Sequence, residues 1–203
     1  MHRPHAALRL ARPSSATQVE HLSALGAALA DPACQLAICH RHADPELGAI
    51  ATLAFTALAS IDTILPVAGL DIALSSALAD AGYPAPLGGA LSRDITDLAR
   101  LHAAIRGVAA VRVRLDWIVG DACRRFHMDY VTTRLLVTYR GAGTQWIEAA
   151  RPDRIRQLPG NAVALLKGRL LVAEPTILHR SPPVADDGDA RLLLVVDPIL
   201  SWD

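Results

Sequence analysis

The spacing of hydrophobic residues divides the chain into two parts with different periodicity. In the first part, apolar residues recur every three or four positions, as they do on one face of a helix. This pattern predicts helices over residues 16–30, 45–60, 71–81 and 92–106. Asp44 before Pro45 is typical of a helix start, because Asp caps the first turn and Pro fits its first position. A short strand is expected at residues 35–40.

From residue 108 onward, apolar residues occupy alternate positions or form short β-rich runs, with Gly and Pro between them. These runs predict strands over residues 111–117, 134–139, 144–147, 162–166, 176–179 and 191–197. Helices followed by strands are typical of an α+β fold. We therefore expect one domain over residues 1–203, in which a mainly helical support layer (1–107) packs on a β-sandwich or barrel (108–203). Residues 1–13 show no periodicity and are expected to form a loose arm.

Composition excludes several classes of protein. The 203 residues include 20 basic and 20 acidic side chains, so the chain has no basic surplus for nucleic acid or for an anionic membrane surface. The longest uncharged run, Leu47 to Ile61, has 15 residues and is shorter than the roughly 18–20 that cross a bilayer. The start of the chain lacks the apolar segment of a secretion signal, and three cysteines make no disulfide framework. A cytoplasmic location is expected.

The strongest candidate for chemistry is His127-Met-Asp129, in the strand-rich half. On a strand, residues i and i+2 point to the same face, so both side chains could reach one metal ion. The spacing alone carries little weight, because His42-Ala-Asp44 repeats it, and Asp44 is explained as a helix cap.

The sequence after Asp129 gives this dyad a context. A strand over 134–139 is followed by the turn Gly141-Ala-Gly143-Thr144, and a later strand ends in Lys167-Gly168. His179 comes next, and Arg191 opens the final apolar strand twelve residues beyond it.

This order resembles that of the Fe(II)- and 2-oxoglutarate-dependent oxygenases of the prolyl-hydroxylase and phytanoyl-hydroxylase type, over roughly residues 120–200. The resemblance implies a double-stranded β-helix of the cupin or jelly-roll kind. It implies that His127, Asp129 and His179 bind iron and are the catalytic centre, since two imidazoles and a carboxylate leave three adjacent coordination positions open. Arg191 would bind the distal carboxylate of 2-oxoglutarate, and Tyr139 would add a hydrogen bond. Arg134 is the alternative anion anchor.

More narrowly, the string from Cys123 to Trp146 resembles a bacterial family defined by a domain of unknown function, whose members tend to lie near zinc-homeostasis genes. A second hypothesis is therefore a cupin-like metal-binding protein without redox chemistry, with zinc as the metal. A third is a metal-free interaction domain with a buried His–Asp pair.

Other candidate residues are better explained by packing. Cys34 and Cys39 with the nearby histidines lack tetrahedral zinc spacing and are predicted to be core residues. Cys123, Trp117 and Trp146 are likewise predicted to pack. The substrate, a small molecule or a peptide, and the oligomeric state do not follow from the sequence.

Overall fold

Two β-sheets and three α-helices form the architecture of the computed structural model, which describes residues 15–42, 44–120, 123–183 and 190–200. The strands are β1 (Ala16–Val19), β2 (Leu36–Cys39), β3 (Ile61–Pro66), β4 (Ala110–Ile118), β5 (Thr133–Arg140), β6 (Gln145–Glu148), β7 (Arg151–Gln157), β8 (Val163–Lys167), β9 (Ile177–Arg180) and β10 (Arg191–Ile199). The helices are α1 (Leu25–Ala30), α2 (Leu70–Asp80) and α3 (Ala85–Arg106), with 3₁₀ helices at Leu22–Ala24, Pro45–Thr52 and Phe55–Ala57.

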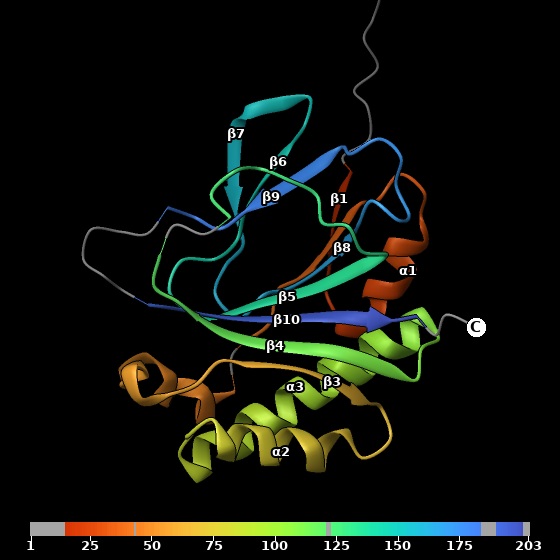
Figure 1. The fold of residues 1–203 in the computed structure, drawn as a ribbon. Helices are drawn as coiled ribbons and strands as arrows, with labels where there is room; N and C mark the ends of the chain where they lie inside the picture. Colours follow the sequence, from red (N-terminus) through yellow and green to blue (C-terminus); the bar gives the residue numbers. More distant parts are fainter. Residues whose placement is uncertain (1–14, 43, 121–122, 184–189, 201–203) are drawn as a thin grey trace, which may run out of the picture.

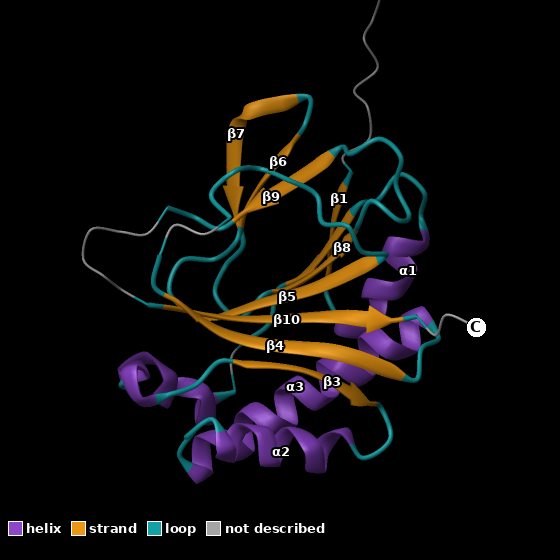
Figure 2. Ribbon diagram, viewed as in Figure 1, coloured by secondary structure: helices purple, strands orange, loops and turns teal. Residues whose placement is uncertain are grey.

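The larger sheet has seven strands in the order β1-β2-β8-β5-β10-β4-β3, and the smaller has three in the order β7-β6-β9. Only β1 and β2 pair in parallel among these described strands. The helices lie on one side of the larger sheet and the β6, β7 and β9 strands on its other side (Figure 1 and Figure 2). The chain therefore folds in three layers.

Each face of the larger sheet has its own hydrophobic core. The helix-side core joins all three α-helices to alternate residues of the central strands, including Leu115, Leu135 and Leu194. The second core lies between the two sheets and includes Leu136, Trp146 and Val195. Because successive side chains of a strand point to opposite faces, the same strands supply both cores.

The predicted α+β fold is confirmed, with α2, α3 and the strands β2, β4, β5, β6, β8, β9 and β10 at or near their predicted positions. Asp44 caps as predicted, since its Oδ1 accepts a 2.9 Å hydrogen bond from the backbone N–H of Glu46. The helix that follows is instead 3₁₀ and stops at Thr52. The arm predicted for residues 1–13 lies outside the described residues.

The described part of the first half is mainly helical, as predicted, but it also supplies β1 and β3, which the sequence did not predict and which join the larger sheet with the predicted β2. Residues 16–19 were predicted as helix, but they pair with β2, which satisfies the backbone of that sheet edge. β3 pairs with β4 along its whole length. β7 was also missed, because all seven of its residues are exposed and it carries no apolar alternation. Within the described ranges, no helix combines the length and the apolar character needed to cross a membrane.

Candidate metal centre

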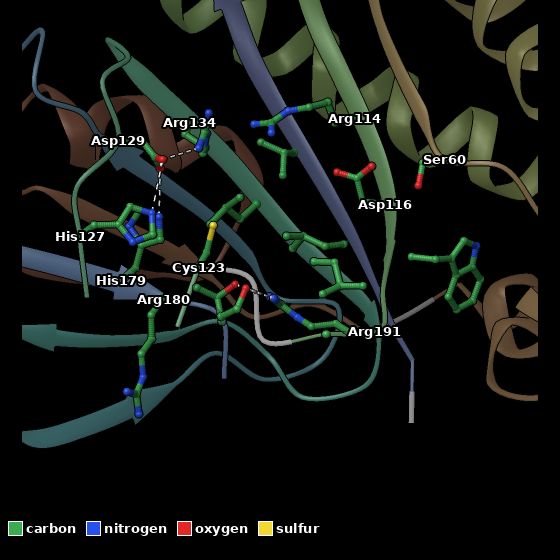
Figure 3. Close-up of a pocket in the computed structure, with 18 of the residues that line it drawn as sticks. Ser60, Arg114, Asp116, Cys123, His127, Asp129, Arg134, His179, Arg180 and Arg191 are labelled. Atoms are coloured by element: carbon green, nitrogen blue, oxygen red, sulfur yellow. Dashed lines mark hydrogen bonds and ion pairs between the residues drawn. The ribbon is translucent and has the colours of Figure 1, made fainter. Parts of the chain in front are cut away.

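His127, Asp129 and His179 converge at one end of the space between the two sheets. Each offers one ligand atom, and these atoms all lie within 4.8 Å of one another. The two histidines come together through an isolated antiparallel bridge, in which each backbone N–H donates to the other's carbonyl, at 3.0 and 2.9 Å. The rings lie 4.8 Å apart between centroids. The predicted triad is therefore assembled in the fold (Figure 3).

Asp129 reaches the site from a loop, and not from a strand as the sequence suggested. That loop is fixed by the residues after β8: the N–H groups of Gly168 and Arg169 donate to the carbonyls of Thr132 and Asp129, at 2.8 and 2.9 Å. A Cβ at Gly168 would lie 2.2 Å from the carbonyl oxygen of Val131, so only glycine permits this approach. Lys167-Gly168 thus positions the carboxylate ligand.

The two carboxylate oxygens of Asp129 have different surroundings. Oδ1 lies 2.6 Å from Nη1 of Arg134, in an ion pair. Oδ2 is buried without a hydrogen-bond partner among the described atoms, although Nε2 of His179 is 3.0 Å away. A buried carboxylate oxygen without a hydrogen bond needs another partner. Oδ2 is the carboxylate oxygen that has no ion pair with Arg134 and is open to a metal ion.

The orientation of His127 also fits a metal ligand. Its Nδ1 lies 2.8 Å from the carbonyl oxygen of Arg125, which can only accept, so Nδ1 donates. In the neutral ring Nε2 then carries the lone pair, and it points toward Oδ1 of Asp129 at 3.6 Å. Metal-ligating histidines usually donate a hydrogen bond from the ring nitrogen that does not bind the metal, and this hydrogen bond fixes the tautomer. The donor set of two imidazoles and one carboxylate therefore fits a divalent transition metal.

The charges around the triad favour an ionised carboxylate. Burial raises the pKa of Asp129, but the neighbouring imidazoles of His127 and His179 and the charge of Arg134 outweigh burial and hold that pKa well below its ordinary value. The interaction with Asp129 correspondingly raises the pKa of His127. The negative charge that a cation requires is thus present at the site.

The triad opens into a cavity of about 440 Å³ that also contains Arg191. Arg191 as a whole is only 6% exposed. Its Nη1 donates to Oγ of Ser181 at 3.1 Å, and its Nη2 donates to Oγ1 of Thr138 and Thr144, at 3.1 and 2.5 Å. Thr144 is placed by the turn before it, where a Cβ on Gly143 would meet the carbonyl oxygen of Leu158 at 1.8 Å.

Arg191 has no acidic partner in the described part of the chain, and its Nε has no hydrogen-bond partner there. Burial lowers its pKa to about 10, so it stays charged at neutral pH. Asp197, on the same strand, does not pair with Arg191, because it binds Arg134 and Arg114. A buried cation held only by hydroxyl groups is a site for an anion.

The other two predicted anchors are placed differently. Tyr139 lies on the opposite face of β5, in the helix-side core, where its hydroxyl donates to Oδ2 of Asp94 at 2.5 Å. Arg134 lines the cavity, but its Nε and Nη2 bind the two oxygens of Asp197, both at 2.7 Å, while its Nη1 binds Asp129. The structure therefore brings Arg134 to the site as the partner of a metal ligand and does not bring Tyr139 there.

The remaining candidates lie as follows. Cys34 and Cys39 are buried core thiols, as predicted, whereas Cys123 is exposed and lines the cavity. Trp146 is buried, and Trp117 stacks on Phe55 with 5.3 Å between ring centroids. Sequence reasoning missed Ser60, Arg114 and Asp116, which line the cavity, and Thr138, which binds Arg191. The alternation of β4 contained a signal, because Arg114 and Asp116 interrupt an apolar strand on one face only.

Solved structures share this fold. The rice dioxygenase for auxin oxidation matches 91% of this chain and 82% of its own, with a TM-score of 0.54 and 13% identity. A Pseudomonas putida prolyl-4-hydroxylase matches 88% of this chain and 98% of its own, with a TM-score of 0.51 and 13% identity. The structure of JOX2 in complex with 2OG, Fe and JA matches 91% and 76%, with a TM-score of 0.50 and 13% identity. The fold is thus that of the 2-oxoglutarate/Fe(II) oxygenases, as the sequence resemblance implied.

The family itself follows from the sequence. Residues 20–197 match the model of a family described as "Protein of unknown function (DUF1826)", and the chain belongs to this family. A search of proteins with curated functions gives no match. The predicted domain-of-unknown-function family is thereby confirmed.

Proposed function

We propose that this protein is a non-haem Fe(II)- and 2-oxoglutarate-dependent oxygenase. The observation that carries the proposal is that a His–Asp–His triad and a buried Arg191, which has no acidic partner among the described residues, line one cavity in the fold of such oxygenases. His127, Asp129 and His179 would hold the iron. Together with bound 2-oxoglutarate, the metal would supply the oxidation of a C–H bond by dioxygen, with succinate and CO2 as co-products.

The protein's own contribution at the metal is to fix three ligands on one side of the ion. The backbone bridge sets the spacing of the two imidazoles, and Arg134 holds Oδ1 of Asp129, which leaves Oδ2 as the ligand atom. Ligands fixed in advance lower the cost of ordering the site when the metal binds.

Arg191 would bind the carboxylate of the cosubstrate that lies farthest from the metal. The hydroxyl groups of Thr138, Thr144 and Ser181 orient the guanidinium without neutralising it. Leu136, Leu193 and Val195 line the same cavity, and such apolar walls exclude water and strengthen the ion pair. The complex of JOX2 with 2OG, Fe and JA supports this assignment, because 2OG and Fe are bound together there in this fold.

The test is anaerobic addition of Fe(II) and then 2-oxoglutarate to the metal-free protein. We expect one bound iron per chain and a weak metal-to-ligand charge-transfer band in the visible when 2-oxoglutarate is added. Arg191→Gln should keep the iron and weaken 2-oxoglutarate binding about 10- to 100-fold, as expected for the loss of a charge-assisted hydrogen bond. Arg112→Gln is the matched control, because Arg112 is an exposed arginine that pairs with Asp62 outside the cavity.

Stoichiometric iron without the band would overturn the oxygenase proposal. Retention of zinc through purification, with no response to 2-oxoglutarate in wild type or in Arg191→Gln, would favour the alternative of a cupin-like metal-binding protein without redox catalysis. The substrate is expected to be a small molecule or a peptide. The three free thiols support the expected cytoplasmic location.

A further inference from the structure

The cavity has a second charged wall, formed by β4 and the residue before β3. Asp116 and Ser60 line it and lie on the side away from the triad (Figure 3). Asp116 is half-buried, and its carboxyl accepts a hydrogen bond from the Ser60 hydroxyl. Burial nevertheless raises its pKa above the ordinary value, which shows that its surroundings do not compensate the charge fully.

The cations near Asp116 are engaged elsewhere. Arg112 binds Asp62, with Nη2 at 2.6 Å, and Arg114 binds Asp197 at 3.3 Å. Neither forms an ion pair with Asp116 within the residues that the structure describes. Of the two carboxylates among the described residues that line the cavity, Asp129 belongs to the metal triad, and Asp116 is the one that stays available to a ligand.

Among the described residues that line the cavity, Arg180, Arg191 and Asp116 have no ion-pair partner. Arg180 binds Gln145 and lies over the ring of Phe126, so the cation Arg191 and the anion Asp116 are the two groups left for a ligand. Figure 3 shows them on separate parts of the wall, with the triad on a third. Arg191 suits the anionic cosubstrate, and a positively charged group suits Asp116. A volume of about 440 Å³ falls within the range of pockets for small molecules.

We infer that the primary substrate carries a cationic amine or guanidinium group, which Asp116 and Ser60 bind while its carbon skeleton lies between them and the metal. Oxidation of such a substrate rests on the proposed function, whereas binding of the cationic group by Asp116 does not. A charge-assisted hydrogen bond in a part-buried site gives selectivity for a cation over a neutral group of the same size. Free amines and a lysine side chain of a peptide share this chemistry.

The test measures binding to the redox-inactive zinc form, so it does not depend on turnover. The probes are n-pentylamine, 1-pentanol and pentanoate, with tryptophan fluorescence as the signal, because Trp117 also lines the cavity. We expect the amine to bind at least about tenfold more tightly than the alcohol. A lysine-containing pentapeptide forms a further arm, and weaker binding than the free amine identifies a small-molecule substrate.

Asp116→Asn should remove the preference for the amine and leave zinc and 2-oxoglutarate binding unchanged. Ser60→Ala should reduce the preference for the amine over the alcohol by a smaller factor. This variant also tests the inference if Asp116→Asn folds poorly. Asp62→Asn is the control, because Asp62 is an exposed carboxylate on β3 outside this cavity. Equal binding of amine and alcohol, no amine binding at millimolar concentration, or an undiminished preference in Asp116→Asn would overturn the inference. Failure of the 2-oxoglutarate band alone would overturn only the proposed reaction.

Discussion

The two faces of the larger sheet divide the work of the molecule. On β4, β5 and β10, one set of alternate residues packs against the helices and is almost wholly apolar: Val111, Val113, Leu115, Leu135, Val137, Leu192, Leu194 and Val196. The other set contains Arg114, Asp116, Arg134 and Arg191, which line the cavity, and Thr138 and Asp197, which bind these arginines. Along each of these strands, alternate residues thus face either the helices, where they stabilise the fold, or the cavity side, where the candidate site lies.

This comparison also explains why charged groups are tolerated so close to the centre of the protein. Several buried polar groups on the cavity side bind one another, as Arg134 and Asp197 do with two hydrogen bonds of 2.7 Å. The helix side has few such groups, and the clearest is His102, which pairs with Thr133 across 2.8 Å. Mutations on the two faces should therefore fail in different ways.

The largest effect on stability is expected from the helix-side core. Leu194→Ala should lower the free energy of unfolding by about 2–5 kcal/mol, because Leu194 is fully buried and leaves a cavity behind. Its Fe(II) affinity should be unchanged at temperatures where the variant is folded. Leu193→Ala, the neighbour that lines the cavity, is the matched control and should lose less stability. Equal losses in chemical denaturation would contradict the division between the faces.

His102 should make stability depend on pH. Burial lowers its pKa to about 4, whereas the unfolded chain has the ordinary value near 6.5. Between these values the unfolded state binds the proton and the folded state does not, so stability is full above pH 6.5 and falls as pH drops toward 4. The loss should reach roughly 3 kcal/mol.

The measurement is urea denaturation of wild type and His102→Gln across this pH range, because glutamine can keep the bond to Thr133. The difference between the two proteins isolates His102 from the other histidines. If the free energies of unfolding of the two proteins depend on pH in the same way, His102 is not the cause of the pH dependence.

Arg134→Gln should weaken Fe(II) binding about 10- to 100-fold, since partners that orient a ligand typically contribute this much. The reason is that Nη1 of Arg134 fixes Oδ1 of Asp129. Arg114→Gln is the control, because Arg114 contacts the same Asp197 without touching Asp129. If an iron titration gives the same affinity for both variants, Arg134 does not contribute to metal binding.

The smallest effect is expected for Tyr139→Phe. Loss of its hydrogen bond to Asp94 should cost about 1 kcal/mol of stability. Its 2-oxoglutarate affinity should equal that of wild type, because the side chain lies on the helix side of β5. A weakened 2-oxoglutarate response in the folded variant would restore the role that the sequence resemblance implied.

Much of the site could be predicted from the sequence, and the errors have physical causes. The triad and Arg191 follow from a motif order that spans β-rich segments, which the fold brings together. Tyr139 is not at the site because side chains alternate between the two faces of a strand. It lies five residues after Arg134 on β5 and therefore faces the opposite side. Asp116 was overlooked because its meaning depends on which cations are already paired, and the sequence does not contain that information.

The fold was less predictable where pairing overrides local preference. β1 lies in an Ala-rich region that favours helix, yet it forms a strand because it pairs with β2 at the edge of the larger sheet. β7 is fully exposed and owes its form to pairing with β6. Strongly amphipathic α3 was found from the sequence because its apolar stripe alone determines how it packs.

The most direct test of the central claim is anaerobic Fe(II) binding to wild type and to His179→Ala, followed by metal analysis. His179 is buried and supplies one of the three ligand atoms. The account predicts one tightly bound iron per chain in wild type and an affinity at least about 100-fold weaker in the variant. Equal iron binding by the two folded proteins, or no iron in wild type, would contradict it.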